Sequence, residues 1–338
     1  MMRKAAIVGT GAYIPENIRT NEWFEKFDLV SSGTDIFDNG GVKERRVISD
    51  EMKSSDMEVL ACRNALEKTG IDANEIDLIL CNSNIQDQLQ PGNACLIQHK
   101  LSANNAGAFN FDSACTGFIN CLILASSMIA IGECETILIV SSTTGTRIAD
   151  YTEKKCMLIG DGAGAAILKP AKTKGRGYLG SSFISDGSLY HTMGRKVKKP
   201  EGWKGKRTYF SGDPEKLYLF IDRTKEGLDK INELGPVQTV EVTKKALNKC
   251  GLKVEDIDFF ICHQAARQLV DAWRKGLNLK ENQYYDTLAD YGNLSNASIP
   301  VTSNEAINQK MIKDDDIVVF SAPGMGWNLS SAVFRWGM

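Results

Sequence analysis

The sequence has few histidines and lacks the cysteine spacings from which metal sites are built. It has three histidines and nine cysteines in 338 residues, and no two cysteines have C-x-x-C spacing. No group of cysteines and histidines has zinc-ligand spacing, so we expect no bound metal. An odd number of cysteines is typical of reduced thiols rather than of a disulfide framework. We therefore expect a cytoplasmic protein in which one thiol is a candidate for reactivity.

An excess of charge of one sign is also missing. Lys and Arg number 40 against 42 Asp and Glu, a net charge of −2. Nucleic-acid binding usually requires a basic excess, so we expect no nucleic-acid partner. The most apolar stretch, residues 115–131, contains polar side chains and barely reaches the length that spans a bilayer. We expect a buried helix there and no membrane partner.

The chain contains one internal repeat. Residues 65–82 read as a helix that stops at glycine, a loop and a buried strand, and they align without a gap with residues 246–263 at an offset of 181. Two further matches follow in the same order: residues 135–142 with 316–322 at nearly that offset, and residues 160–168 with 324–334 at an offset that begins at 164. Strands and helices alternate in both parts. The pattern predicts an α/β fold of two duplicated βαβ-type halves, 1–170 and 171–338, with largely parallel sheets and a pocket where they meet.

Cys115 lies where an apolar segment with a small-residue turn leads into the long apolar helix. A cysteine at a helix N-terminus meets unpaired backbone N–H groups and the positive end of the helix dipole. Both favour the thiolate, which is the nucleophilic form of the side chain. The alternative is a buried core cysteine, which is the usual environment of this residue type.

The three histidines offer few candidates for a catalytic base. His99 is expected at the exposed end of a helix, and His191 follows a turn with no obvious partner. His263 directly follows a buried apolar strand, and sites in open α/β sheets form at the carboxyl ends of strands. A structural histidine remains the alternative for His263.

A polar turn rich in glycine and asparagine, residues 291–300, precedes a helix that we expect over 303–313. An asparagine amide can donate to an oxyanion without titrating. Asn296 and Ser298 are better interpreted as helix caps. The order Cys, His, Asn also occurs in papain-like hydrolases, but their local Cys-Gly-Ser-Cys-Trp signature is absent here.

One strongly basic segment, residues 195–207, interrupts the alternation of strands and helices. It contains seven Lys or Arg residues and one acid, with glycine and proline among them. It is either a solvated loop or a docking surface for an acidic partner.

Taken together, these motifs resemble the β-ketoacyl-acyl-carrier-protein synthase III family of the thiolase superfamily over nearly the whole length. The matching segments are residues 7–15, 41–45, 113–118, 160–166, 263–265 and 292–298. The resemblance implies a thiolase fold in five αβαβα layers, a homodimer, an acyl-carrier-protein partner and no cofactor. The implied activity is that of an acyltransferase. It would condense an acyl thioester with malonyl-acyl-carrier protein, with decarboxylation, in fatty-acid initiation or a related specialised pathway.

The resemblance also implies a role for each site residue. Cys115 would hold the acyl group, and the backbone N–H groups of Cys115 and Met325 would form the oxyanion hole. His263 and Asn293 would bind the thioester carbonyl of malonyl-carrier protein and stabilise the enolate. Substrate or carrier contacts would fall to Arg267, Gln90, Gly324 and Gly326.

The related subfamilies differ in their catalytic residues. A degradative thiolase uses a second cysteine near the C-terminus, but no cysteine follows Cys262 here. The elongating synthases use a Cys-His-His set, but no histidine follows His263, so Asn293 takes the second position. A Cys-His-Asn set is typical of the initiating type.

Several positions depart from the family pattern, and they concern the substrate. Typical members sandwich the adenine of coenzyme A between a Trp and an Arg. The corresponding positions here are Asp35, Asn39-Gly40 and Glu153-Lys154-Lys155. Ala266 stands where the family usually has Asn, and Gln268 where it usually has Arg. Gln90 stands where an aromatic residue commonly lines the acyl tunnel of the partner. We therefore expect an acyl-carrier protein or an unusual acyl thioester as donor. Two alternatives remain: an acyl-thioester hydrolase or acyl shuttle using Cys115 and His263, and a silent partner subunit.

Overall fold

The structure, a computed structural model, is built on two sheets that come from different parts of the chain. It describes residues 3–26, 40–88, 90–149, 151, 154–197, 217–221 and 225–338. The first sheet has the order β1 (Ala5–Tyr13), β7 (Asp161–Pro170), β6 (Ile137–Thr144), β4 (Leu78–Ser83), β5 (Gly107–Asn110). The second has the order β8 (Gly177–Ser185), β13 (Asn328–Arg335), β12 (Ile317–Gly324), β11 (Phe259–Cys262).

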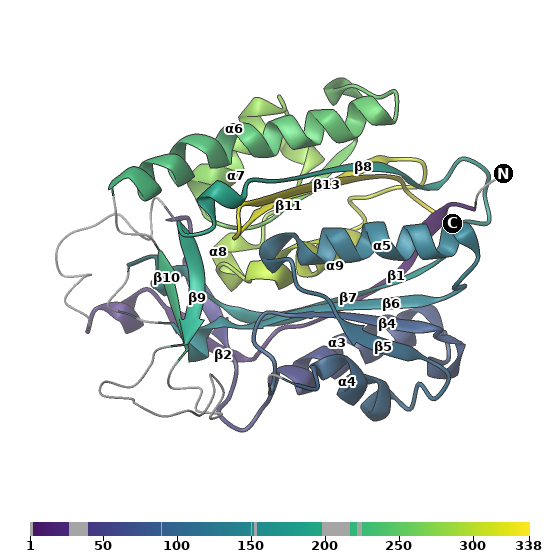
Figure 1. Ribbon diagram of the computed structural model, residues 1–338, viewed down its shortest axis with the longest axis horizontal. Helices are drawn as coiled ribbons and strands as arrows, with labels where there is room; N and C mark the ends of the chain where they lie inside the picture. The colour runs from purple at the N-terminus through teal and green to yellow at the C-terminus, as the bar shows by residue number, and fades with distance from the viewer. Residues whose placement is uncertain are drawn as a thin grey trace.

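Helices cover both outer faces of the sheets and fill the space between them (Figure 1). α3 (Ser54–Thr69) and α4 (Asn93–Leu101) lie on the outer face of the first sheet, and α6 (Lys225–Lys249) and α7 (Arg267–Gly276) on that of the second. α5 (Gly117–Ile131) and α9 (Ser298–Asn308) lie between the sheets. The five αβαβα layers confirm the fold class predicted from the sequence.

The two sheets repeat the same topology. The order β1-β7-β6-β4 is matched by β8-β13-β12-β11, and α5 and α9 begin 181 residues apart. A parallel bridge from Phe260 to Tyr284 lies where β5 would have its counterpart. These matches support a division at residues 170 and 171, which stays a prediction.

The sheets are mixed rather than largely parallel, so that sequence expectation was wrong. β4 pairs in parallel with β5 and β6, and β11 with β12, but β7 and β13 are antiparallel to both of their neighbours. β13 follows β12 after a connection of only three residues, which is too short for the crossover that parallel strands need. Two small ladders complete the described strands: β2 (Asn17–Thr20) with β3 (Glu44–Val47), and β9 (Met193–Val197) with β10 (Leu217–Ile221).

The central helix α5 is the most apolar helix that the structure describes. The stretch Ala114–Ile131 is long and apolar enough to cross a membrane by length and composition, and half of it is buried within the protein. Phe118, Ile119 and Leu122 are fully buried in one cluster with side chains from both sheets. α5 is therefore a core helix, as the sequence predicts.

Candidate active site

Cys115 lies in a 3₁₀ turn, η3 (Ala114–Thr116), that leads directly into α5. Ala114 has a left-handed φ of 47°, which is uncommon for a residue other than glycine and is typical of functional sites. The backbone N–H of Ala114 donates to Asp112 Oδ1 at 3.0 Å, which stabilises this turn. Cys115 itself is 9% exposed, so its thiol lies at the start of the buried helix, where the sequence placed it.

A second turn of the same kind, η10 (Ser295–Ala297), precedes α9. Ser295 has a φ of 50° and lies 181 residues after Ala114, so the repeat extends to this unusual backbone conformation. The two turns meet between the sheets, where Cys115 Sγ is 3.5 Å from Ser295 Oγ. Asn84 Nδ2 donates to Ser295 Oγ at 2.8 Å, which fixes the hydroxyl group beside the thiol.

His263 directly follows β11 and is 4% exposed. Its Nδ1 lies 2.8 Å from Ser298 Oγ. Ser298 Oγ is also within 2.8 Å of the Ser295 carbonyl oxygen, so the imidazole is linked to the turn that contacts Cys115. The donor and acceptor roles at Nδ1 depend on the tautomer of the ring.

Asn293 is held by both its backbone and its side chain. Its backbone N–H donates to Leu158 O at 2.8 Å, and its Oδ1 accepts from the Ser295 N–H at 2.8 Å. Its Nδ2 donates to Ala265 O at 3.0 Å, two residues after His263. The amide carries two N–H groups, so this bond leaves one of them for another acceptor. The segments that carry His263, Asn293 and Cys115 therefore converge on one place.

Two glycines allow this convergence. A Cβ atom on Gly160 would lie 2.0 Å from Tyr291 O, and one on Gly292 would lie 2.6 Å from Leu158 O. Either contact is impossible for a real side chain, so glycine is required at both positions. This close approach explains why these glycines stand in the motifs at residues 160–166 and 292–298.

The hairpin between β12 and β13 lies against the nucleophile turn. A Cβ atom on Gly324 would be 3.3 Å from the backbone N of Cys115 and 3.2 Å from that of Thr116. Asn328 Nδ2 donates to Met325 O at 2.8 Å and closes the hairpin. The two segments expected to form the oxyanion hole are therefore in contact.

Two other expected contact residues, Arg267 and Gln90, have different surroundings. Arg267 begins α7 and forms an ion pair with Asp286, so its charge is already compensated in this chain. Gln90 is exposed on the connection between β4 and α4. Three groups of sequence expectations lie outside the residues or side chains that the structure describes: Asp35 and Asn39, Glu153-Lys154-Lys155, and the basic segment 195–207.

The interpretation of Asn296 and Ser298 as helix caps was wrong. α9 begins at Ser298, five residues earlier than expected, and neither side chain makes a capping hydrogen bond. Asn296 Nδ2 donates instead to Asn82 Oδ1 at 2.8 Å, and Ser298 contacts His263. Asn296 therefore makes a contact between the halves, and Ser298 makes one within the second half. His99 and His191 are exposed, so His263 is the histidine that lies near Cys115.

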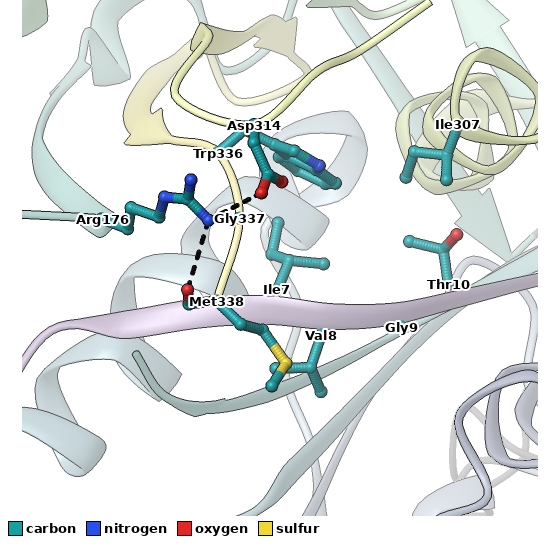
Figure 2. Close-up of a pocket in the computed structure, with 10 residues that line it drawn as sticks. All are labelled: Ile7, Val8, Gly9, Thr10, Arg176, Ile307, Asp314, Trp336, Gly337 and Met338. Atoms are coloured by element: carbon teal, nitrogen blue, oxygen red, sulfur yellow. Dashed lines mark hydrogen bonds and ion pairs between the residues drawn. The ribbon is translucent and has the colours of Figure 1, made fainter. Parts of the chain in front are cut away.

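A surface cavity of about 420 Å³ lies elsewhere, where β1 meets the C-terminal residues (Figure 2). Its charged wall is formed by Arg176, which donates to Asp314 Oδ2 at 2.8 Å and to Met338 O at 3.4 Å. The carboxylate of Asp315 also pairs with this guanidinium. None of the expected site residues lines the cavity, so we do not assign the chemistry to it.

Comparisons with known proteins agree with this arrangement. The family model described as 3-Oxoacyl-[acyl-carrier-protein (ACP)] synthase III matches residues 109–187, and that of its C-terminal part matches residues 247–336. The β-ketoacyl-[acyl-carrier-protein] synthase III of Natranaerobius thermophilus is 35% identical, with 99% of this chain and 100% of the relative covered. The chain belongs to the β-ketoacyl-acyl-carrier-protein synthase III family. The resemblance stated from the sequence is thus confirmed.

Two further members of the synthase III family extend this result. The enzyme of Geobacillus kaustophilus is 34% identical over 98% of this chain and 99% of its own length. The crystal structure of 3-oxoacyl-[acyl-carrier-protein] synthase III from Aquifex aeolicus VF5 superimposes with a TM-score of 0.84 at 28% identity, covering 98% of this chain and 100% of the other. The similarity to the family therefore extends over nearly the full length of the chain.

Sequence reasoning missed Ser295 as a contact of Cys115. It also missed the contact between Asn82 and Asn296, for which the repeat contained a signal. At the 181-residue offset Cys115 corresponds to Asn296, and Asn82 corresponds to His263. Asn82 and Asn296 hydrogen bond to each other. This synthase III family member thus has two related pairs of residues. Cys115 and His263 supply a thiol and an imidazole, and Asn296 and Asn82, at the corresponding positions, supply two amides.

We expect the stability of this family member to respond to the titration of Asp161, the acid of its glycine-rich motif. Asp161 is fully buried and accepts hydrogen bonds from Thr146 and from the Ile48 N–H at 2.9 Å. Burial raises the pKa of Asp161 from 3.8 to about 6, although these hydrogen bonds oppose the shift. The protonated Asp161 side chain therefore stabilises the folded state at low pH. This contribution to the unfolding free energy is lost as the pH rises from about 4 to 6, by about 3 kcal/mol.

Urea unfolding at pH 4, 5, 6 and 7 measures this effect. Across that window the unfolding free energy of the wild type should fall relative to that of Asp161→Asn. Asp50→Asn, which removes an exposed carboxyl group, is the matched control. Curves for the wild type and Asp161→Asn that remain parallel over the whole range would contradict the prediction.

Proposed function

We propose that this protein is an acyltransferase that performs a decarboxylating Claisen condensation. An acyl thioester is held on Cys115 and joined to malonyl-acyl-carrier protein, giving a 3-oxoacyl-carrier protein in fatty-acid initiation or a related specialised pathway. The observation that carries the proposal is the 3.5 Å contact between Cys115 Sγ and Ser295 Oγ. Ser295 is also hydrogen-bonded to Asn293 and to Ser298, the partner of His263.

In the first half-reaction the sulfur of Cys115 attacks the thioester carbonyl carbon of the donor. The carbonyl oxygen becomes an oxyanion, and the backbone N–H groups of Cys115 and Met325 are the proposed donors to it. The tetrahedral intermediate collapses, the C–S bond to the donor breaks, and the donor thiolate leaves and takes up a proton. Sulfur suits both steps because it is a soft nucleophile and a good leaving group.

In the second half-reaction His263 and Asn293 donate to the thioester carbonyl oxygen of malonyl-carrier protein. The bond to the carboxylate breaks, carbon dioxide leaves, and the electron pair forms an enolate that both donors stabilise. The enolate carbon attacks the acyl carbon, and Cys115 Sγ is released as thiolate. For this role the His263 proton lies on Nε2, and the single hydroxyl proton of Ser298 turns from Ser295 O to His263 Nδ1. Electrons balance without a metal or redox cofactor.

Acyl-carrier protein is the proposed macromolecular partner, and an acyl-carrier protein or an unusual acyl thioester is the proposed donor. Arg267 and Gln90 are the proposed contacts, with Gln90 reaching the acyl tunnel of a second subunit. Gly324 and Gly326 would border the substrate beside Met325. We also propose a cytoplasmic location, which is supported by nine cysteines that form no disulfide.

A homodimer is the proposed assembly. β5 is an edge strand of the first sheet, and Phe109 on it is 45% exposed. An unprotected edge with an exposed aromatic side chain favours pairing with a second copy. Sedimentation velocity at micromolar concentration should give a dimer, and a stable monomer would contradict this part of the proposal.

The central experiment incubates the enzyme with a panel of acyl thioesters and with malonyl-carrier protein labelled in its free carboxyl group. Mass spectrometry should find the acyl group on Cys115, and labelled carbon dioxide should appear together with a 3-oxoacyl-carrier protein. Acyl-Cys115 that is only hydrolysed or passed on, without carbon dioxide, would support the hydrolase or shuttle. A chain that does neither would be a silent subunit. Ready acetylation by micromolar acetyl-coenzyme A would contradict the proposed donor class alone.

A further inference from the structure

A hydrogen-bonded bridge joins the nucleophile turn to the second half of the chain. Its centre is Asn120, which lies in the first turn of α5. Asn120 Nδ2 donates to Ser113 Oγ at 2.8 Å and to Thr116 Oγ1 at 3.3 Å. Asn120 Oδ1 accepts from Ser330 Oγ at 2.8 Å, and Ser330 belongs to β13. The Asn120 carboxamide therefore donates to residues of the first half and accepts from a residue of the second half.

The turn end of the bridge encloses the nucleophile. Ser113 Oγ lies 2.7 Å from Thr116 Oγ1, and the Thr116 backbone N–H donates to Ser113 O at 3.2 Å. Cys115 lies between these two residues in the chain, and Thr116 is fully buried. The bonds that Asn120 makes therefore hold the backbone on both sides of Cys115.

The other end of the bridge holds the hairpin that carries Met325. Ser330 is 1% exposed and pairs with Ala322 in the β12–β13 ladder. The hairpin begins two residues beyond Ala322, at Gly324, which lies against the backbone N of Cys115. The contact between Asn120 and Ser330 thus fixes how closely this hairpin approaches the nucleophile turn.

We propose that Asn120 is a positioning residue for the oxyanion hole of the first half-reaction. By joining Ser330 to the nucleophile turn, it sets the placement of the Cys115 N–H relative to the Met325 N–H. These two groups are 210 residues apart in the chain, so their alignment depends on contacts between the halves. Such donors act through preorganisation, and a displacement of about 1 Å can reduce a rate about 100-fold. The inference rests on the proposed function.

The bridge does not include the groups proposed for the second half-reaction. His263 is held by Ser298, and Asn293 by Ala265 and Ser295. Decarboxylation of malonyl-carrier protein in the absence of an acyl donor should therefore be independent of Asn120. This separation distinguishes a positioning role from general damage to the fold.

The test is Asn120→Leu, which removes both ends of the bridge at similar side-chain size. The rate constant for acylation of Cys115 should fall roughly 10- to 100-fold. The half-saturating donor concentration, and carbon dioxide release without donor, should stay within about twofold of wild type. Time-resolved mass spectrometry measures the first two quantities, and labelled malonyl-carrier protein measures the third.

Ser330→Ala removes one bond of the bridge and tests the same idea with a smaller change. Its effect on acylation should disappear in the Asn120→Leu background, because interacting residues are not additive. Ser126→Ala, at another buried position of α5, is the matched control and should be acylated at the wild-type rate.

Wild-type acylation in Asn120→Leu, or an equal fall in acylation and decarboxylation, would overturn the inference. If Asn120→Leu does not fold, Ser330→Ala decides by the same two rates. A wild-type enzyme that is never acylated at Cys115 would contradict the proposed function itself, and the inference with it.

Discussion

Replacement of Cys115 with alanine is expected to abolish acyl transfer, with a loss of roughly 10⁴-fold or more in kcat/KM. The side chain supplies both the nucleophile and the leaving group, so no part of the covalent route survives its removal. The Ser295 hydroxyl group, 3.5 Å away, is a poor substitute because it is not ionised at neutral pH. Mass spectrometry after incubation with the preferred donor should find the acyl mass on the wild type and none on Cys115→Ala.

The same variant should still release carbon dioxide from malonyl-carrier protein, because His263 and Asn293 are unchanged. Cys95→Ala is the matched control: Cys95 is the exposed cysteine, on α4, and its loss should leave acylation intact. Wild-type condensation by Cys115→Ala, or an acyl group that is found on Cys95 instead, would show that the nucleophile was assigned to the wrong residue.

Much of this site could be predicted because its signals are local. A helix that ends at glycine, a buried strand and a small-residue turn each depend on a few neighbouring residues, so the repeat of residues 65–82 in residues 246–263 was visible at one constant offset. The position of Cys115 at the start of α5 follows from the same local pattern. The strand before His263 was equally clear, since all four residues of β11 are buried.

The direction of the strands could not be predicted from those signals. A strand that is buried on both faces has the same apolar pattern in a parallel and in an antiparallel sheet. The antiparallel placement of β13 follows from its three-residue connection to β12.

Contacts between residues far apart in the chain also could not be predicted from local patterns. Ser295, Ser298 and Asn120 are small polar residues near helix starts, where capping is the usual role. Each of them instead contacts a residue that is between 35 and 210 positions away, namely Cys115, His263 and Ser330 respectively. Only the folded arrangement of the two turns brings those partners together.

The second large effect is expected at the enolate. His263→Ala and Asn293→Ala should each lower the rate of malonyl decarboxylation by about 10²–10³-fold, the usual result of removing one donor to an oxyanion. Acylation of Cys115 should change little, because the oxyanion of that step is assigned to backbone N–H groups. Labelled carbon dioxide and the mass added to Cys115 measure the two steps separately.

Asn293→Asp is the sharper variant of this pair. It keeps the shape of the side chain and an acceptor for the Ser295 N–H, but it removes the N–H groups that bond Ala265 O and the substrate. It also places negative charge beside a developing anion, so its decarboxylation rate should be no higher than that of Asn293→Ala. The double variant His263→Ala/Asn293→Ala should lose less than the product of the two single losses, because both donors act on the same oxygen. If the single variants decarboxylated normally and failed instead to be acylated, the imidazole and the amide would belong to the first half-reaction and not to the second.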